Sequence, residues 1–172
     1  MYTFLDNHDQ TRVASNVSNP AHLGTLYTLL FTLPGILSVY YGSEWGVKGI
    51  KEKFSDTDIR PYIDIENRFL YSTWLTGHIS KLAHIRQGEK ALKYGNYRQI
   101  YLDYQRPFVF ERSIENERIY VAVNIADNDA VIDLSAHCKG SFLDLLLEEH
   151  IADTRHIQVK AHSARILKED TK

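Results

Sequence analysis

The N-terminal part of the chain combines two short apolar runs with one helical pattern. Residues 2–5 form the first run and residues 36–41 the second. The second run is too short for a helix and lacks a clean alternation, which is typical of a parallel strand buried on both faces. Between the runs, apolar side chains recur at helical spacing, at Leu23, Leu26, Tyr27, Leu30 and Leu33. The order strand, helix, strand predicts a right-handed crossover within one sheet.

Turn-forming residues set the expected bounds of two helices. Asn19 at the N-cap and Pro20 in the first turn predict the start of the first helix, and Pro34-Gly35 its end. A long polar loop, residues 46–64, follows the second strand, and loops of that length are usually functional. We expect Asp64 to cap a second helix that Gly88 ends. Its predicted apolar face consists of Phe69, Leu70, Trp74, Leu82 and Ile85.

After Gly95 the apolar period changes from helical to two residues. Residues 108–112 and 119–125 alternate as strands on either side of a hairpin-like turn at 114–117. Short antiparallel strands separated by polar turns predict a small β-sandwich. Further strands are expected at residues 131–134, 141–146, 157–159 and 164–167.

Composition and charge exclude several classes of protein. The chain has 172 residues, 44% hydrophobic and 24% charged, as in folded globular proteins. Its net charge is −2 and its Lys and Arg residues are scattered, so the sequence shows no basic patch for binding nucleic acid. No apolar run is long enough to cross a membrane. Cys138 is the only cysteine, which favours a reducing compartment such as the cytoplasm but leaves the localisation open.

Metal and cofactor signals are missing from the sequence. The eight histidines include no pair at metal-ligand spacing on a helix, and no cysteine pair is present. The chain also has no glycine-rich phosphate loop and no local motif for a serine or cysteine nucleophile. We therefore expect no metal site and no cofactor among these residues.

The strongest chemical signal stands at the end of the first predicted strand. Asn7, His8 and Asp9 directly follow an apolar run, so they are expected at the carboxyl edge of a parallel sheet. Catalytic groups of parallel α/β folds lie at that edge.

Two motifs carry a family resemblance along essentially the whole chain. The segment FLDNHDQTR, residues 4–12, resembles the motif at the end of barrel strand seven in the alpha-amylase family (glycoside hydrolase family 13). PGILSVYYGSEWG, residues 34–46, resembles its strand eight. The resemblance covers only the family's C-terminal part. It implies that residues 1–95 are the last two βα units of a (β/α)8 barrel, an α/β partial TIM barrel, and that residues 96–172 are the all-β antiparallel sandwich that follows.

The resemblance implies a role for Asp9 and for His8. In the family motif the last aspartate stabilises the transition state, and the histidine before it contacts the same sugar. Glycosidic cleavage develops positive charge on the sugar ring, so a fixed carboxylate binds more tightly as the reaction proceeds. The alternative is that residues 6–9 form only a polar turn after a strand.

Four further residues are candidates for substrate binding. Arg12 fits the family pattern and is expected to orient neighbouring carboxylates, or else to form a surface ion pair. Trp45 lies on the same rim, where it either stacks on a glucose ring or serves as a packed wall. Asp56 and Arg60 resemble a family pair that binds sugar hydroxyls at a distant subsite, but Thr57 replaces the proline often found there, and an exposed charged loop is the alternative.

Two catalytic groups of a retaining glycosidase are missing from this sequence. The nucleophile and the general acid would stand in an Arg-x-Asp context and on the next strand, and no Arg-x-Asp occurs here. We expect the chain to derive from an enzyme acting on α-1,4-glucans or maltooligosaccharides but to be inactive by itself. The strands at residues 2–5 and 36–41 would leave barrel edges exposed, so self-association is expected.

Other functions remain open at this point. The chain could be a carbohydrate-binding or structural β-sandwich module, or a catalytically silent amylase relative, and these differ in whether Asp9 matters. A calcium site is common in the family but mostly uses upstream residues, so none is assigned. These residues do not determine the exact substrate or the bond preference. They also do not determine whether the reaction is hydrolysis or glycosyl transfer.

Overall fold

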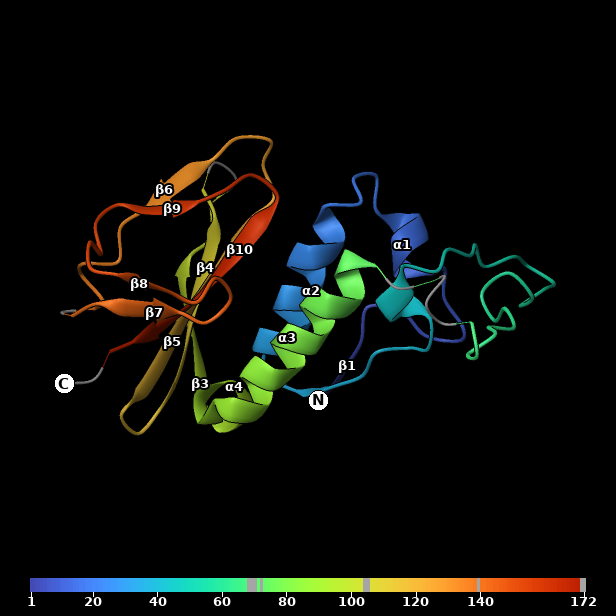
Figure 1. Ribbon diagram of the computed structural model, residues 1–172, viewed down its shortest axis with the longest axis horizontal. Coiled ribbons are helices and arrows are strands. Elements are labelled where there is room, and N and C mark those ends of the chain that lie inside the picture. The colour runs from blue at the N-terminus through green and yellow to red at the C-terminus, as the bar shows by residue number, and fades with distance from the viewer. Residues whose placement is uncertain (68–70, 72, 104–105, 139, 171–172) are drawn as a thin grey trace.

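Helices cover one face of a six-stranded antiparallel sheet, and a two-stranded sheet covers the other (Figure 1). The computed structural model describes residues 1–67, 71, 73–103, 106–138 and 140–170. In chain order the elements are β1 Tyr2–Thr3, α1 Val13–Asn16, α2 His22–Thr32, β2 Ile36–Leu37, the 3₁₀ turn η1 Ser43–Trp45, α3 Trp74–Gly88, α4 Lys90–Tyr94, β3 Asn96–Tyr101, β4 Phe108–Ile114, β5 Glu117–Asn124, β6 Ala130–Ile132, β7 Phe142–Asp144, β8 Glu149–Ile151, β9 Ile157–Val159 and β10 Ser163–Glu169.

The predicted order strand, helix, strand is present at the N-terminus. β1 and β2 pair in parallel, with Tyr2 opposite Ile36 and Thr3 opposite Leu37, and α2 connects them. Each strand is only two residues long, shorter than the apolar run that predicts it. In the described part of the chain these two strands pair only with each other, so the backbone ladder ends soon after it begins.

The first predicted helix starts later than expected. α2 begins at His22, and the side chain of Asn19 accepts a hydrogen bond from the Ala21 backbone nitrogen at 3.0 Å. Asn19 therefore closes a turn before the helix, and its prediction as N-cap is wrong. The predicted end is confirmed, because α2 stops at Thr32, ahead of Pro34.

The second predicted helix is shorter than expected, and its cap is different. α3 starts at Trp74, and Thr73 caps it by accepting a hydrogen bond from the Leu75 nitrogen at 3.2 Å. Asp64 was predicted to be the cap; instead it accepts from the Glu66 nitrogen at 3.0 Å in a separate turn. Local side-chain to backbone bonds compete with helix formation in this way. The end at Gly88 is confirmed.

The apolar face of α3 is confirmed only in part. Leu82 is fully buried and Ile85 packs against the same core. Trp74 is 59% exposed, so its placement on the buried face is wrong. Phe69 and Leu70, also predicted for this face, lie outside the described residues.

The strands of the second half form one large sheet in the order β3-β4-β5-β10-β7-β8. Every neighbouring pair is antiparallel, and β4 and β5 form the predicted hairpin, with Ile114 opposite Glu117 and Glu115 at a φ of 51°. β3 and β8 are not predicted by the sequence pattern. Both lie at sheet edges and are largely exposed, so their residues carry little apolar alternation.

Two hydrophobic cores lie on opposite faces of the large sheet. The helix-side core joins α2, α3 and α4 to one face of β4, β5 and β10. The second core lies between the other face and the β6–β9 pair, which is the thin second layer of the sandwich (Figure 1). Because the first core includes side chains from both halves of the chain, the boundary between residues 1–95 and 96–172 stays a prediction.

Two arginines hold the C-terminal end of α2, Arg112 to the sheet and Arg86 to α3. Arg112, on β4, is fully buried and donates to the backbone oxygens of Thr32 and Gly95 at 2.5 and 2.9 Å. Arg86, on α3, donates to the oxygens of Phe31 and Gly35 at 2.6 and 2.7 Å. Helix C-termini leave carbonyl groups without partners and favour cations. Burial lowers the pKa of Arg112 to about 10.

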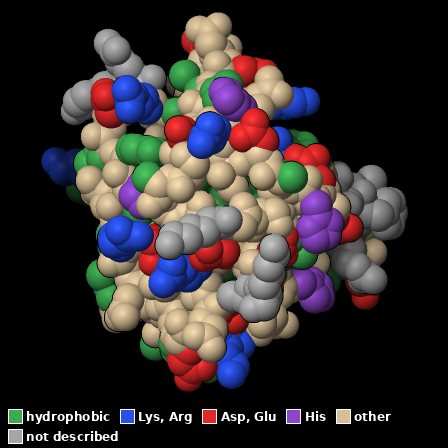
Figure 2. Space-filling model, turned by 90° about the vertical axis from the view of Figure 1, so that its left-hand side faces the viewer, with side chains coloured by type: hydrophobic (Ala, Val, Ile, Leu, Met, Phe, Trp, Pro, Cys, Tyr) green, Lys and Arg blue, Asp and Glu red, His purple; other side chains and the backbone are tan. Residues whose placement is uncertain are grey.

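The surface shows no concentration of one charge on the face that Figure 2 presents. Basic, acidic and histidine side chains are interspersed there over the end of the molecule formed by the β-strands. Across the described residues, no helix combines the length and the apolar character that crossing a membrane requires.

Candidate functional site

Asp6 anchors the loop that carries the predicted catalytic residues. It lies just after β1, is buried, and accepts hydrogen bonds from the Val13 nitrogen at 2.9 Å and from Ser43 Oγ at 2.8 Å. The first bond ties the loop to α1 and the second ties it to η1. A buried carboxylate with these partners fixes both ends of the loop.

His8 and Asp9 lie side by side and face solvent. His8 Nε2 is 3.1 Å from Asp9 Oδ2, and their side chains are 60% and 62% exposed. The Asp9 nitrogen donates to Asn7 Oδ1 at 2.9 Å, which closes a turn and turns the carboxylate outward. The pair therefore presents an anion and an imidazole on the same loop, both accessible to a ligand.

The long loop brings Arg60 and Asp56 to the same place. Arg60 Nη2 lies 3.1 Å from Asp9 Oδ1 and 2.8 Å from Asp56 Oδ2, and Arg60 Nε donates to the His8 oxygen at 2.9 Å. Lys51 also pairs with Asp56. The hydrogen bond from Lys51, together with the charge of Arg60, lowers the pKa of Asp56. Asp56 and Arg60 therefore lie together at partly exposed positions, and Arg60 also reaches Asp9.

Backbone bonds hold this loop against the Asp9 segment. The Arg12 nitrogen donates to the Gly49 oxygen, the Gly49 nitrogen to Ser15 Oγ, and the Lys51 nitrogen to Thr11 Oγ1, each at 2.9 Å. At Gly49 a Cβ would lie 2.2 Å from the Asp58 oxygen, so only glycine permits this approach. The predicted long loop is thus fixed near its start.

Arg12 is a buried residue, so the expectation of a surface ion pair is wrong. Its guanidinium donates to the Tyr41 oxygen at 2.8 Å and to Ser43 Oγ at 3.1 Å, and lies 4.2 Å above the Tyr40 ring. Ser43 in turn donates to Asp6. Arg12 therefore acts on a carboxylate through Ser43 and stacks on an aromatic face, where a cation is favourable.

Trp45 lies at the end of η1 and stacks on Tyr71. The ring centroids are 5.6 Å apart with planes 26° from parallel. Trp45 is half-buried, with Tyr71 as an aromatic neighbour. The choice between a sugar platform and a packed wall remains open.

Sequence reasoning missed Asp6, Ser43 and Lys51. Asp6 had a usable signal, because an aspartate directly after an apolar strand is positioned to accept backbone hydrogen bonds. Ser43 had none, since its partner Asp6 is 37 positions away and only the fold brings the two together. Lys51 and Asp56 are 5 positions apart in one loop, and no periodic pattern pairs them. Among the described residues, no group of three His, Cys, Asp or Glu side chains has an arrangement that could hold a metal ion.

The loop, its partners and the strand order can be compared with known proteins. The family model "Alpha amylase, catalytic domain" matches residues 1–70. The alpha-amylase of Niallia circulans is 32% identical over 147 residues, covering 84% of this chain and 26% of that protein. The chain belongs to the alpha-amylase family. A cyclomaltodextrin glucanotransferase of Bacillus sp. (strain 1-1) is 28% identical over 164 residues, covering 94% of this chain and 22% of that relative.

Solved structures of the alpha-amylase family share the fold of the whole chain. The alpha-amylase from Geobacillus thermoleovorans, complexed with acarbose, has a TM-score of 0.78 at 22% identity. The match covers 100% of this chain and 39% of that amylase. The maltogenic amylase from S. marinus has a TM-score of 0.75 at 27% identity, and the match covers 97% of this chain and 22% of that one. The chain spans about a quarter or less of the curated relatives it matches. Family membership makes it part of a group of glycoside hydrolases.

Proposed function

We propose that this chain forms the C-terminal part of an alpha-amylase-type glycoside hydrolase acting on α-1,4-glucans or maltooligosaccharides by a retaining mechanism. Asp9 stabilises the cationic, ring-flattened transition state, because its attraction to the sugar grows as positive charge develops. The observation that carries the proposal is that Arg60, from the long loop, meets His8 and Asp9 on the exposed loop after β1. The names of the relatives, amylases and glucanotransferases, agree with this substrate class.

His8 and the charged loop bind the sugar in this proposal. His8 contacts hydroxyls of the same glucosyl unit that Asp9 stabilises, and Asp56 and Arg60 contact hydroxyls farther along the glucan. Arg12 acts from behind, because its bond to Ser43 and the bond of Ser43 to Asp6 position the loop. Trp45 contributes a stacking surface at the rim.

The same proposal assigns residues 1–95 to the end of a (β/α)8 barrel and residues 96–172 to the β-sandwich that follows. The parallel β1–α2–β2 order and the family match over residues 1–70 support the first assignment. The antiparallel six-stranded sheet supports the second. Since the sequence lacks Arg-x-Asp, these 172 residues need a nucleophile and a general acid from other barrel strands.

Two assays test the proposal. The isolated chain, incubated with maltodextrin, should release no reducing ends above the blank. A chimera, in which residues 1–172 replace the matching segment of the Niallia circulans alpha-amylase, should turn over the same substrate. In that chimera Asp9→Asn should lower kcat by about a hundredfold or more, since it removes the stabilising charge and keeps the size.

Asp153→Asn is the matched control, because Asp153 is an exposed aspartate remote in sequence from the loop. Full turnover by the folded Asp9→Asn chimera would contradict the catalytic role and favour a carbohydrate-binding or structural module. A folded chimera without turnover before mutation would favour a catalytically silent relative. Turnover by the isolated chain would contradict the need for further barrel strands.

A further inference from the structure

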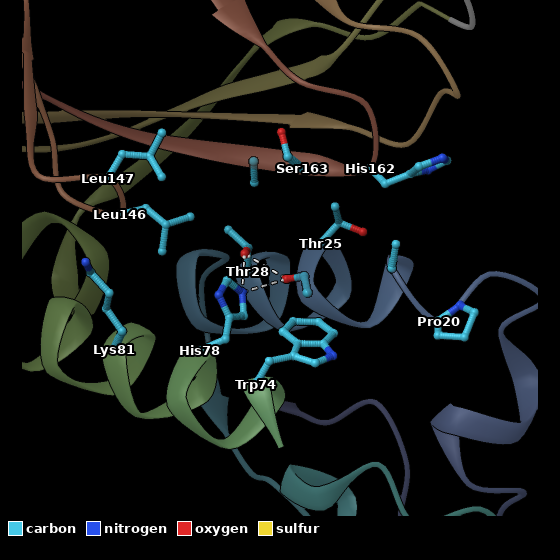
Figure 3. A pocket seen from close by; sticks show the side chains of 13 residues that line it. Pro20, Thr25, Thr28, Trp74, His78, Lys81, Leu146, Leu147, His162 and Ser163 are labelled. Atoms are coloured by element: carbon cyan, nitrogen blue, oxygen red, sulfur yellow. Dashed lines mark hydrogen bonds between the residues drawn. The ribbon is translucent and has the colours of Figure 1, made fainter. Parts of the chain in front are cut away.

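A cavity of about 550 Å³ opens between the helices and the start of β10 in the large sheet (Figure 3). α2 and α3 form one side of it, and the start of β10 with the turn between β7 and β8 forms the other. Its volume lies within the range of roughly 300–1,000 Å³ that small-molecule sites occupy. None of its lining residues belongs to the loop that carries Asp9, so it is separate from the candidate catalytic site.

Trp74 lines this cavity with an indole that the fold does not bury. It is the first residue of α3 and remains 59% exposed, although the helical pattern predicts it for the buried face. Figure 3 shows its ring beside His78 at the cavity. A large aromatic surface left open next to a concavity is a platform for the apolar face of a ligand.

Gly24 accommodates the edge of that indole. A Cβ at Gly24 would lie 3.3 Å from Trp74 Cη2 and Cζ3, closer than ordinary contact. Gly24 does not have a left-handed backbone, so its conformation does not require glycine. Glycine inside a helix costs roughly 0.5–1 kcal/mol relative to alanine. Glycine at position 24 therefore lowers the stability of α2 slightly. It also leaves the space in which the exposed Trp74 indole lies.

The hydroxyl groups around the cavity are left as hydrogen-bond acceptors. Thr25 donates its proton to the His22 oxygen at 2.9 Å, and Ser163 donates to the Lys160 oxygen at 2.8 Å. A hydroxyl has one donor and two acceptor lone pairs, so each oxygen can still accept. Thr25 is buried, so the hydroxyl that a ligand can reach is that of the partly exposed Ser163.

The charges at the rim are already paired. Lys81 Nζ lies 2.5 Å from Glu148 Oε1, so the cavity offers no free cation for an anionic ligand at that point. A neutral ring with an apolar C–H face and hydroxyls on its rim matches these features, with its C–H face on the indole and its hydroxyls toward Ser163 and the ion pair.

We propose that this cavity is a second binding site for an α-glucan chain, holding a glucosyl unit against Trp74 away from Asp9. The choice of an α-glucan rests on the proposed function. The site gives the enzyme a hold on a long substrate that does not depend on the catalytic loop. Only residues of this chain line it, so it can be tested on the chain alone.

The test is calorimetric titration of the 172-residue chain with maltoheptaose. Saturable binding is expected, and Trp74→Ala should weaken it at least tenfold. Trp74→Phe should weaken it less, because a smaller ring still stacks. Tyr94→Ala is the matched control, since Tyr94 is an exposed aromatic on α4 outside the cavity, and it should leave binding unchanged. Gly24→Ala, which pushes the indole away, should also weaken binding.

Three results would overturn the site: no saturable binding by the folded chain, equal binding by Trp74→Ala, or binding lost in Asp9→Asn but kept in Trp74→Ala. Circular dichroism establishes that each variant is folded, and removing a side chain this exposed should not unfold the protein. The proposed catalytic role is read separately, from the turnover of the Asp9→Asn chimera. Failure of one proposal is therefore distinguishable from failure of the other.

Discussion

Arg60 Nη2 lies 3.1 Å from the Asp9 carboxylate, although 51 positions separate them in the sequence. The same guanidinium donates to the His8 backbone oxygen and pairs with Asp56. One side chain of the long loop thus contacts both Asp9, predicted to be catalytic, and His8, predicted to bind sugar. We therefore expect Arg60 to position Asp9 in addition to its predicted contact with sugar.

Replacing Arg60 by Gln in the chimera should lower kcat/KM by about tenfold, which corresponds to about 1.4 kcal/mol of transition-state stabilisation. The physical reason is that Asp9, itself exposed, loses a donor that fixes its carboxylate. Steady-state kinetics on maltodextrin measures the effect. Arg155→Gln, in the turn before β9, should leave kcat/KM unchanged. A change in KM alone would indicate that Arg60 only binds substrate.

Arg112→Met should destabilise the chain by about 1–3 kcal/mol, because the C-terminal carbonyl groups of α2 would lose a buried donor. Urea unfolding, followed by circular dichroism, measures the loss. Arg118→Met is the control, since that side chain is half-exposed and its ion pair with Glu169 spans 3.9 Å. Equal costs for the two variants would mean that Arg112 does not fasten α2 to the sheet.

The stability of the chain should fall on acidification below about pH 6.5 because of His78. Burial lowers the pKa of His78, and the hydrogen bond from His78 Nε2 to the Gly24 oxygen at 3.0 Å opposes this shift only in part. The unfolded state therefore binds a proton at a pH where the folded state does not, and stability rises with pH in that window. The contribution is full above the ordinary value of 6.5 and is lost as pH falls through the folded pKa.

Melting temperatures at pH 7.5 and 5.5 measure this dependence. His78→Gln should flatten it, while His84→Gln, at an exposed position on the same helix, should leave it as in the unmodified chain. An unchanged pH dependence in His78→Gln would assign the acid sensitivity to other groups.

Self-association through the β1–β2 pair is expected for the isolated chain. Ile36 is 73% exposed, and Tyr2 opposite it is 63% exposed, so the strand pair carries apolar side chains in solvent. Light scattering should show a mass that rises with concentration, and Ile36→Lys should reduce the rise. Val131→Lys, an equally apolar exposed position on β6, should not. A constant monomer mass would contradict this expectation.

Patterns among residues close together in the sequence predicted much of the fold. The hairpin of β4 and β5, the helix between two parallel strands, and the C-terminal ends of α2 and α3 follow from periodicity and from Gly and Pro. β3 and β8 escaped prediction because they are exposed edge strands that the hydrogen bonds of a neighbour define. Trp74 was misplaced because a helical period says which side chains share a face and not whether another element covers that face.

The sequence by itself determined the family, the position of His8 and Asp9 after a strand, and the change from helices to antiparallel strands near Gly95. Only the tertiary structure decided which groups surround them. It buried Arg12 on Tyr40, brought Arg60 to Asp9, and left Trp74 open beside a cavity. The physical reason is range: propensity and periodicity act over a few residues, whereas burial and ion pairing depend on contacts that only chain folding creates.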